Sequence, residues 1–351
     1  MTRAGDGGVV LARGPVPVPV RFDVSAETRL AAAPPGRIAH QFAADFQFLP
    51  DAELVAVGSR SRENAEAFGA QYHIPHRHAS YEALAADPEV EIIYVATPHI
   101  FHYRDSLLCL QHGKAVLCEK AFTINAREAE QLIAFARREK LFLMEAMWTR
   151  FQPALIKLRE LLAAGTIGEQ RMLRGELAFR APFDPSGRLF DPALGGGALL
   201  DLGIYPLALA AMIFGAAPAD IRGVAHIGAT GVDEQCAFML QYPEGQLASL
   251  FAAVRTAAPG GAVLLGSEGR IEIHGPLYRP ESLTVIPEGR EPQIFPTPYR
   301  GHGYLYEARE VMHCLAAGKT ESETMPLDES LALMRIMDTL RRQWNLRYPT
   351  E

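Results

Sequence analysis

In the middle of the chain, apolar residues follow two patterns that alternate along the sequence. Continuous apolar runs at 53–58, 91–97, 115–119 and 141–145 each end at a turn, as buried strands do. Between these runs, apolar positions return every three or four residues, which predicts helices. Strands that alternate with helices indicate a parallel sheet with right-handed crossovers. This is the Rossmann-type, doubly wound α/β architecture of nucleotide-binding domains.

The pattern changes after Arg150. Residues 171–180, 233–256 and 269–274 are predicted as strands, the second of them folding back as a hairpin around Tyr242–Gly245. Because no helices separate these strands, we expect an α+β unit with a mostly antiparallel sheet. Two helices, near 304–317 and 327–344, close the chain.

The first 35 residues follow neither pattern. Prolines alternate with valines between Pro15 and Pro19, and alternating prolines cannot supply the hydrogen bonds of a central strand. We therefore expect residues 1–35 to be irregular, with only a poor first strand at 29–33. A nucleotide-binding domain should follow at 36–147, and a second domain at 148–351.

Composition narrows the class of protein. The 351 residues suggest about two domains. A net charge of −7 without a basic run argues against a nucleic-acid partner. No apolar stretch approaches the ~20 residues of a membrane helix, and the run at 207–214 predicts a core helix. The start of the chain lacks a signal sequence. Four scattered cysteines without a CxxC pair predict neither disulfides nor a zinc site, so we expect a cytoplasmic protein with no membrane partner.

Lys120 lies just past the end of a predicted buried strand. Asn125 and Glu128 form a capping box that begins the next helix. In an open α/β sheet, ligands bind outside the carboxyl ends of the strands, so Lys120 is a candidate binding or catalytic residue. The alternative is a solvated loop lysine.

A basic segment follows the strand at 53–58. An acidic residue here would bind the ribose hydroxyls of NAD, whereas a basic residue accommodates the 2′-phosphate of NADP. The chain has no acid at this point but has Ser59, Arg60 and Arg62. Guanidinium donors suit a phosphate, so this segment favours NADP. The alternative is a pair of solvated arginines at a helix start.

A run of three glycines at 195–197 leads into an apolar helix. The glycines would let the backbone approach a ligand closely. Asp201 and Tyr205 are four residues apart and share one helix face, and Pro206 would kink that helix near its start. With Lys120 nearby, the pair could move a hydroxyl proton, and the lysine would lower the pKa of the phenol. The alternative is a buried tyrosine beside a structural aspartate.

Two histidine clusters have simpler explanations. His73, His76 and His78 could suggest a metal site, but no Cys, Asp or Glu is spaced with them, and a plain loop is preferred, so no metal is predicted. His99 and His102 follow Pro98 at the ligand edge of the sheet. They could line a nicotinamide pocket or simply begin the next helix.

Several motifs together resemble one family. They are Ser59–Arg60–Ser61, Ala96–Thr97–Pro98, Glu119–Lys120, Met144–Phe151 with its Trp148–Thr149–Arg150 string, and Gly195–Tyr205 preceded by Arg188, Phe190, Asp191 and Pro192. In this order they resemble the glucose–fructose oxidoreductase/inositol dehydrogenase (Gfo/Idh/MocA) family. Within it, they are similar to the branch of dimeric dihydrodiol dehydrogenases and NADP-dependent D-xylose dehydrogenases.

The resemblance implies a Rossmann domain and a C-terminal domain whose open sheet covers the active site and forms a homodimer. It implies hydride transfer between NADP and a hydroxyl-bearing carbon of a small molecule, either a sugar (an aldose such as D-xylose) or a trans-dihydrodiol. Lys120 would bond the reacting hydroxyl, Tyr205 would accept or donate its proton, and Asp201 would orient the substrate or Lys120. Trp148, Arg150 and Phe183 would be pocket walls. The implied cofactor contacts are Gly36, Arg37, Ile38, Ser59, Arg60, Arg62, Thr97, Pro98, His102, Glu119 and Lys120.

The chain departs from the family pattern in two places. Ala121 replaces the proline of Glu-Lys-Pro, for which we expect a modest effect. In the phosphate loop, only Gly36–Ala39 matches the end of Gly-x-Gly-x-x-Gly/Ala, and Pro34 and Pro35 remove backbone N–H donors. Either this loop binds the cofactor weakly or not at all, or the N-terminal segment is misread. The first explanation carries an alternative function, an inactive family member that binds a sugar-like ligand or a protein.

Overall fold

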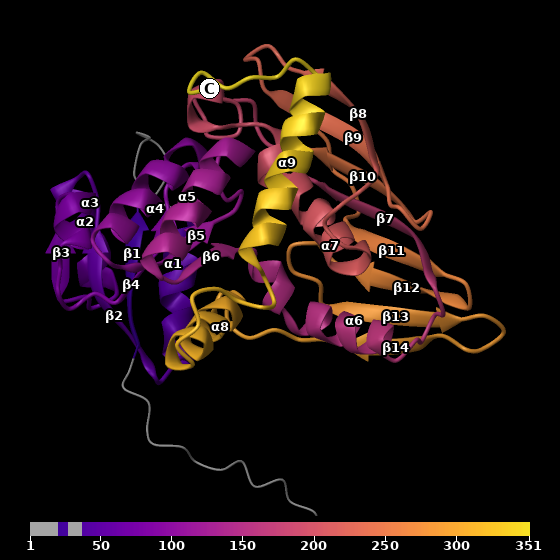
Figure 1. Ribbon diagram of the computed structural model, residues 1–351, viewed down its shortest axis with the longest axis horizontal. Coiled ribbons are helices and arrows are strands. Elements are labelled where there is room, and N and C mark those ends of the chain that lie inside the picture. Colours follow the sequence, from indigo (N-terminus) through magenta and orange to yellow (C-terminus); the bar gives the residue numbers. More distant parts are fainter. Residues whose placement is uncertain (1–19, 27–36) are drawn as a thin grey trace, which may run out of the picture.

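The computed structural model describes residues 20–26 and 37–351, arranged as two domains side by side (Figure 1). The first domain contains a six-stranded, fully parallel sheet in the order β3-β2-β1-β4-β5-β6. This strand order is that of the doubly wound dinucleotide-binding fold, so the predicted Rossmann architecture is confirmed. The strands are β1 (Val20–Ala26), β2 (Ala52–Gly58), β3 (His76–His78), β4 (Ile92–Ala96), β5 (Ala115–Glu119) and β6 (Leu143–Ala146).

Strand β1 corrects the prediction that residues 1–35 are irregular. Val20–Ala26 pairs in parallel with β2 on one side and β4 on the other, at the centre of the sheet. The prolines did not exclude this strand because the last of them, Pro19, precedes it and removes no hydrogen bond from its interior. Residues 1–19 and 27–36 lie outside the described residues, and with them Pro34, Pro35 and Gly36 of the phosphate loop.

Helices cover both faces of this sheet, so the neighbouring strands β4 and β5 are buried on both sides and consist mostly of apolar residues. Asn125 caps α5 by accepting from the Glu128 N–H at 2.9 Å, which confirms the predicted helix start. The Glu128 carboxylate accepts from the Ile124 N–H rather than from Asn125. The helices of this domain are α1 (Arg37–Asp45), α2 (Arg62–Gln71), α3 (Tyr81–Ala85), α4 (His102–Gln111) and α5 (Ala126–Glu139).

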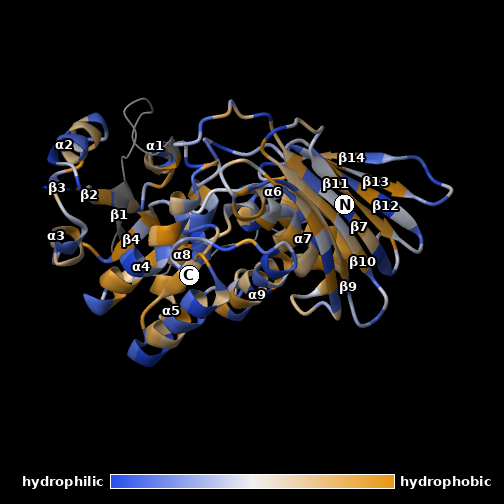
Figure 2. Cartoon of the chain, turned by 90° about the horizontal axis from the view of Figure 1, so that it is seen from above, coloured by the Kyte–Doolittle hydropathy of each residue, from blue (hydrophilic) through white to orange (hydrophobic). Residues whose placement is uncertain are grey.

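The second domain is built on an eight-stranded sheet in the order β14-β13-β12-β11-β7-β10-β9-β8. Only the β7–β10 pair is parallel, so the predicted mostly antiparallel sheet is confirmed, including the hairpin of β9 and β10. In Figure 2 these strands are hydrophobic over much of their length. The strands are β7 (Gln170–Ala178), β8 (Asp220–Ile227), β9 (Asp233–Gln241), β10 (Leu247–Ala253), β11 (Gly261–Gly266), β12 (Gly269–His274), β13 (Ser282–Pro287) and β14 (Gln293–Pro296).

Four helices accompany this sheet: α6 (Pro153–Ala163), α7 (Ile204–Phe214), α8 (Leu305–Ala316) and α9 (Leu327–Gln343). The helical run Pro192–Phe214, which ends in α7, is long and apolar enough to cross a membrane, contrary to the expectation from the sequence. However, 83% of its most apolar window is buried inside the protein. That burial is characteristic of a core helix, as predicted for residues 207–214.

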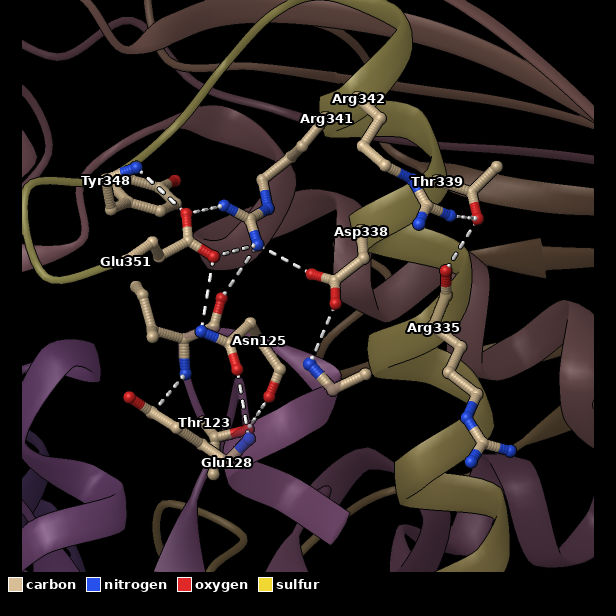
Figure 3. A network of polar contacts seen from close by, with 12 residues as sticks. Thr123, Asn125, Glu128, Arg335, Asp338, Thr339, Arg341, Arg342, Tyr348 and Glu351 are labelled. Carbon is tan, nitrogen blue, oxygen red and sulfur yellow. Dashed lines mark hydrogen bonds and ion pairs between the residues drawn. The ribbon is translucent and has the colours of Figure 1, made fainter. Parts of the chain in front are cut away.

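The C-terminal helix α9 lies between the two domains and packs against α5 and β8 (Figure 1). Figure 3 shows the polar network at its end. Arg341 donates to Glu351 and Asp338, each at 2.6 Å, and to the Ile124 carbonyl oxygen at 3.1 Å. Asp338 accepts from the Ala126 N–H at 2.9 Å. The end of the chain thereby holds the segment that follows Lys120.

Candidate active site

Lys120 extends from the end of β5 into the second domain. Its Nζ donates to the Asp201 main-chain oxygen at 2.8 Å and to Asp201 Oδ1 at 3.1 Å. The lysine is only 6% exposed, so the alternative of a solvated loop lysine is wrong. An ammonium has three N–H donors, and two of them are used in these bonds. One donor therefore remains for a substrate oxygen.

Asp201 is held by a second cation that the sequence reasoning assigned no role. Arg188 donates to Asp201 Oδ1 at 2.8 Å and to Oδ2 at 3.3 Å, while its side chain is 52% exposed. Burial alone would raise the pKa of Asp201, but Arg188 and Lys120 outweigh it and hold the pKa far below its ordinary value. Asp201 is therefore a permanent carboxylate that fixes the direction of Lys120. No spacing rule points to Arg188, which was singled out only as part of the family motif.

Tyr205 is paired with Trp148 rather than with Lys120. The Trp148 indole N–H donates to the Tyr205 hydroxyl at 2.9 Å, whereas Lys120 Nζ lies 5.0 Å from the centre of the Tyr205 ring. Burial raises the pKa of Tyr205 well above its ordinary value, and the negative charge of Glu119 is the second cause. The hydrogen bond from Trp148 opposes that rise. The prediction that the lysine lowers this pKa is wrong, because the ammonium faces the ring and not the oxygen. The phenol is neutral and able to donate a proton.

A π-helical turn, Leu199–Gly203, places Asp201 beside Lys120 just before α7 begins. Pro206 has no N–H to donate to residue 202, and the turn before it is wider than an α-helical turn. The kink expected at Pro206 stays a prediction. The carboxylate of Asp233 accepts from the Leu199 N–H at 2.7 Å and holds the beginning of the turn. Burial raises the pKa of Asp233 to about 7.

The glycine run serves contacts between parts of the protein. Gly195 has φ +74°, and a Cβ there would lie 2.9 Å from the Cβ of His99. The His99 ring donates through Nδ1 to the Gly195 carbonyl oxygen at 2.9 Å. Burial lowers the pKa of His99 to about 3, so its imidazole is neutral. The Gly195 backbone thus lies close to His99 of the Rossmann domain, and the predicted approach of the glycine run to a ligand stays a prediction.

His102, which is predicted as a cofactor contact, is bonded within the protein, and its contact with a cofactor stays a prediction. It is 1% exposed, and its ring nitrogens lie 2.8 Å from the Ala121 carbonyl oxygen and 2.7 Å from the Thr97 carbonyl oxygen. The ring therefore braces the loop after β4 against the loop after β5, where the Lys120–Ala121 peptide bond is cis. Thr97 itself is buried, and its hydroxyl has no hydrogen-bond partner among the described residues.

Beneath Lys120 lies a group of buried acids. Glu119 accepts from the Tyr94 hydroxyl through one oxygen and from the Lys120 N–H through the other, at 3.1 Å. Glu119 is 4% exposed, so it acts as an anchor of the Lys120 backbone. Glu307 is fully buried, and burial followed by Glu119 raises its pKa well above the ordinary value. Glu307 is therefore a neutral carboxylic acid.

The end of β2 carries the predicted phosphate-binding segment. Ser59 is buried, donates its N–H to the His78 carbonyl oxygen at 3.1 Å and accepts from the Ser61 N–H through its hydroxyl. Arg60 and Arg62 are exposed. A surface pocket of about 470 Å³ opens beside Arg60, and Arg104, which sequence reasoning missed, also lines it. The guanidinium groups of Arg60 and Arg104 lie 5.5 and 4.6 Å from the ring centre of Phe101.

The predicted pocket walls differ in role. Trp148 stacks on Tyr304 at 4.5 Å between ring centres, behind Tyr205. Arg150 is not a free wall residue: it is 5% exposed, and its guanidinium donates to Glu329 and to main-chain oxygens, including that of Ala208 at 3.0 Å. It braces the second domain and borders a small internal cavity with Tyr205.

The remaining predicted site residues are located as follows in the structure. Phe183 is 44% exposed against Phe190, and its part in a substrate pocket stays a prediction. Ile38 is half-buried in α1, and Pro98 is half-buried before the next helical turn. Arg37 begins α1, but its side chain, like Gly36, lies outside the described residues.

The fold and the site together define a two-domain oxidoreductase with a dinucleotide-binding domain. A lysine from the ligand edge of the Rossmann sheet meets an aspartate and a neutral phenol from the second domain. An ammonium, a carboxylate and a phenol are groups that can move a proton. This arrangement gives no support to the alternative of an inactive binding module.

Comparison with known proteins identifies the family. Residues 35–147 match the oxidoreductase family with an NAD-binding Rossmann fold, and residues 155–275 match the Gfo/Idh/MocA C-terminal domain. The chain belongs to the Gfo/Idh/MocA family of oxidoreductases, so the resemblance drawn from the motifs is confirmed and the protein is an NAD(P)-dependent dehydrogenase.

Its relatives include trans-1,2-dihydrobenzene-1,2-diol dehydrogenases. The protein from Mus musculus is 41% identical over 327 residues, covering 90% of this chain and 96% of the mouse protein. The one from Homo sapiens is 39% identical over 324 residues, covering 90% of this chain and 96% of the human protein.

Solved structures share the fold. An aldose–aldose oxidoreductase from Caulobacter crescentus in complex with glycerol aligns with a TM-score of 0.82 at 24% identity, covering 92% of this chain and 96% of that chain. A 3-ketoreductase from Actinomadura kijaniata in complex with NADP and TDP-benzene aligns with a TM-score of 0.78 at 24% identity, covering 92% of this chain and 97% of that chain.

Proposed function

We propose that this protein is an NADP-dependent dehydrogenase that oxidises one hydroxyl-bearing carbon of a trans-dihydrodiol. The observation that carries the proposal is the Lys120–Asp201 pair beside the neutral Tyr205 phenol, in a chain about 40% identical to dihydrodiol dehydrogenases. An aldose such as D-xylose is the second candidate. It also carries vicinal hydroxyls, and the resemblance of the motifs covers both substrate classes.

The described residues fit a dinucleotide cofactor. The strand order reverses between β1 and β4, which is where the crevice for a dinucleotide forms in this fold. The loop after β4 carries Thr97, whose buried hydroxyl has no partner among the described residues and can bond a polar ligand. Arg60 stands at the end of β2, where the fold brings the adenosine ribose.

Lys120 and Tyr205 would handle the proton. The bound nicotinamide supplies or accepts the hydride. Lys120 donates its remaining N–H to the substrate oxygen, and Asp201 keeps the ammonium in that direction. In reduction, the Tyr205 hydroxyl donates its proton to the forming alcohol. In oxidation, the phenol must first lose its proton, so the rate should rise with pH.

The preference for NADP rests on positive charge at the adenosine end. Arg60 and Arg104 line one pocket, and Glu82 and Asp105 also border it. Arg104 already donates to Asp105 at 2.8 Å, so we assign the 2′-phosphate to Arg60, with Arg62 as a second donor at the start of α2. Guanidinium groups bind phosphate through paired charge-assisted hydrogen bonds.

We further propose a cytoplasmic homodimer. The face of the large sheet turned away from its helices exposes Val224 at 72% and Met239 at 47%. Exposed apolar side chains on an antiparallel sheet suit a two-fold contact with a second copy. The four cysteines are buried thiols, which suits a reducing compartment. Light scattering after size exclusion tests the dimer, and a monomer would contradict it.

The experiment that tests the proposed function is a rate measurement. Purified protein with NADP⁺ is given trans-1,2-dihydrobenzene-1,2-diol, its cis isomer, or D-xylose, and NADPH formation is followed by absorbance. We expect turnover with the trans-diol and little with the cis isomer. Turnover with D-xylose alone would favour the second candidate. A folded protein that binds NADPH but turns over none of these substrates would contradict the proposal.

A further inference from the structure

The edge strand β3 carries two histidines on one face. Residues two apart on a strand point to the same side, so His76 and His78 are neighbours while Arg77 points away. Arg77 instead donates to the Ile74 carbonyl oxygen at 3.0 Å and to Glu66 at 2.9 Å. The two imidazoles are 40% and 23% exposed, so solvent reaches both.

A carboxylate that sequence reasoning overlooked meets both rings. Asp87, in the turn after α3, places Oδ2 2.6 Å from His76 Nδ1 and 2.8 Å from His78 Nε2. One ligand atom from each of the three residues lies within 4.8 Å of the others. The expectation that no acid accompanies these histidines is therefore wrong. His73, the third histidine of that expectation, is exposed and outside the cluster.

The Asp87 carboxylate is already oriented. Its other oxygen, Oδ1, accepts from the Glu89 N–H at 2.9 Å, and Lys114 Nζ holds the turn through the main-chain oxygens of Asp87 and Val90. Asp87 thus presents its Oδ2 oxygen in a fixed direction, as supported metal ligands do.

We propose that His76, His78 and Asp87 form a divalent-metal site of the zinc type, open to water. Two imidazole nitrogens and one carboxylate oxygen are the donor set that Zn²⁺ and its neighbours in the first transition row accept. Zinc binds such ligands at about 2.0–2.2 Å, so a small outward movement of the rings admits an ion between the three atoms. Water fills the remaining positions, because both rings border solvent.

Metal binding would stabilise the edge of the Rossmann sheet at β3. The site joins β3 to the turn that leads to β4, and β3 itself holds the Ser59 N–H through the His78 carbonyl oxygen. An ion bound only by the folded chain stabilises it in proportion to ln(1 + [metal]/Kd). The proposed site is therefore structural and independent of the catalytic residues.

The test uses the full chain without a histidine tag, stripped with EDTA. Zn²⁺ binding is measured by calorimetry and Co²⁺ binding by its visible absorption. Asp87→Asn keeps the shape and the acceptor for Glu89, and His78→Gln removes one ring. His73→Asn is the matched control, since His73 is a neighbouring histidine with φ 58°, which Asn tolerates. Loss of a ligand should weaken binding by at least the ~10–100-fold that loss of a supporting partner costs.

We expect one Zn²⁺ to bind to the wild type and to His73→Asn, with a rise in the midpoint of thermal unfolding. Asp87→Asn and His78→Gln should bind Zn²⁺ at least ~10–100-fold more weakly, and their midpoints should rise less at the same Zn²⁺ concentration. Equal binding by the wild type and both ligand variants would locate the ion elsewhere and overturn the proposal. No binding by the wild type would also overturn it, and the cluster would then be two histidines hydrogen-bonded to an aspartate.

Discussion

The Lys120 ammonium and the Asp201 carboxylate lie 3.1 Å apart across the boundary between the two domains, each side chain 6% exposed. One comes from the end of a parallel strand and the other from a π-helical turn. The Gly195 carbonyl oxygen accepts from His99 nearby, and His102 contacts the Ala121 carbonyl oxygen in the loop after β5. The pair therefore lies among the contacts that pack the two domains together.

Lys120→Met should abolish turnover and leave the fold intact. Methionine keeps the aliphatic length but donates no hydrogen bond to the substrate oxygen, while Arg188 still pairs with Asp201. We expect turnover to fall about 10²–10⁴-fold, the usual contribution of a proton-handling group. Lys319→Met, at a side chain with 45% exposure, is the control. Unchanged turnover in Lys120→Met would refute the assignment of the lysine.

Trp148→Phe should move the pH dependence of alcohol oxidation upward. The indole N–H stabilises the Tyr205 phenolate, and phenylalanine removes that bond while keeping an aromatic ring against Tyr304. A hydrogen bond of about 1–1.5 kcal/mol corresponds to roughly one pKa unit. The profile of kcat/KM against pH measures the shift. Trp344→Phe, at the other tryptophan, is the control and should leave the pH profile unchanged. An unchanged profile in Trp148→Phe would mean that Tyr205 does not handle the proton.

Arg60→Ala should weaken NADPH binding far more than NADH binding. Loss of a charge-assisted hydrogen bond to the 2′-phosphate costs about 1.5–3 kcal/mol, or roughly 10–100-fold in Kd. Fluorescence titrations with both cofactors measure the difference, with Arg138→Ala, 63% exposed, as a surface control. An equal loss of affinity for NADPH and NADH would show that Arg60 does not bind the 2′-phosphate.

Glu145→Gln should change how stability depends on pH. Burial raises the pKa of Glu145 to about 7, so the folded state keeps its proton between pH ~4.5 and ~7 while the unfolded state loses it. Stability contributed by the protonated group is therefore lost as pH rises through that window, by about 1.4 kcal/mol per unit. Glutamine keeps an acceptor for the Phe122 N–H and does not titrate. Chemical denaturation measures the free energy of unfolding at each pH. The value for the variant should rise relative to that of the wild type up to pH 7. If the two proteins showed the same dependence on pH, Glu145 would be ionised in the folded state.

Arg341→Met should destabilise the protein without altering the chemistry of the site directly. Arg341 is 3% exposed and joins Asp338, Glu351 and the Ile124 carbonyl oxygen (Figure 3). Removing one partner of a buried ion pair costs about 3–5 kcal/mol. Urea denaturation measures the loss. A change below about 0.5 kcal/mol would mean that the network is a surface feature.

The sequence predicted the strands with the clearest patterns, but it did not predict β1, β3, β8, β11, β13 or β14. In Val20–Ala26, apolar Val20, Phe22 and Val24 alternate with polar residues, which is a strand pattern. A central parallel strand is expected to be a continuous apolar run, and the prolines at 15, 17 and 19 argue against a strand nearby. The run at 91–97 fitted that expectation and was recognised as β4.

For the site, motifs located the residues but not their partners. Lys120, Asp201 and Tyr205 were predicted together, and the structure brings them together. The Tyr205 oxygen is hydrogen-bonded by Trp148 and not by Lys120. This choice of partner depends on packing between distant segments, which residue spacing in the sequence does not show. The same limit hid Arg188 beside Asp201, and Asp87 beside the histidines of β3.

If this chain is a working NADP-dependent dehydrogenase, as we propose, a fluorescence titration with NADPH and with NADH should show it. We predict tight, saturable NADPH binding and much weaker NADH binding, despite Pro34 and Pro35 in the phosphate loop. A protein shown to be folded that binds neither cofactor would refute the proposal. The same titration after a Gly-x-Gly loop is restored would then separate a broken enzyme from a binding protein.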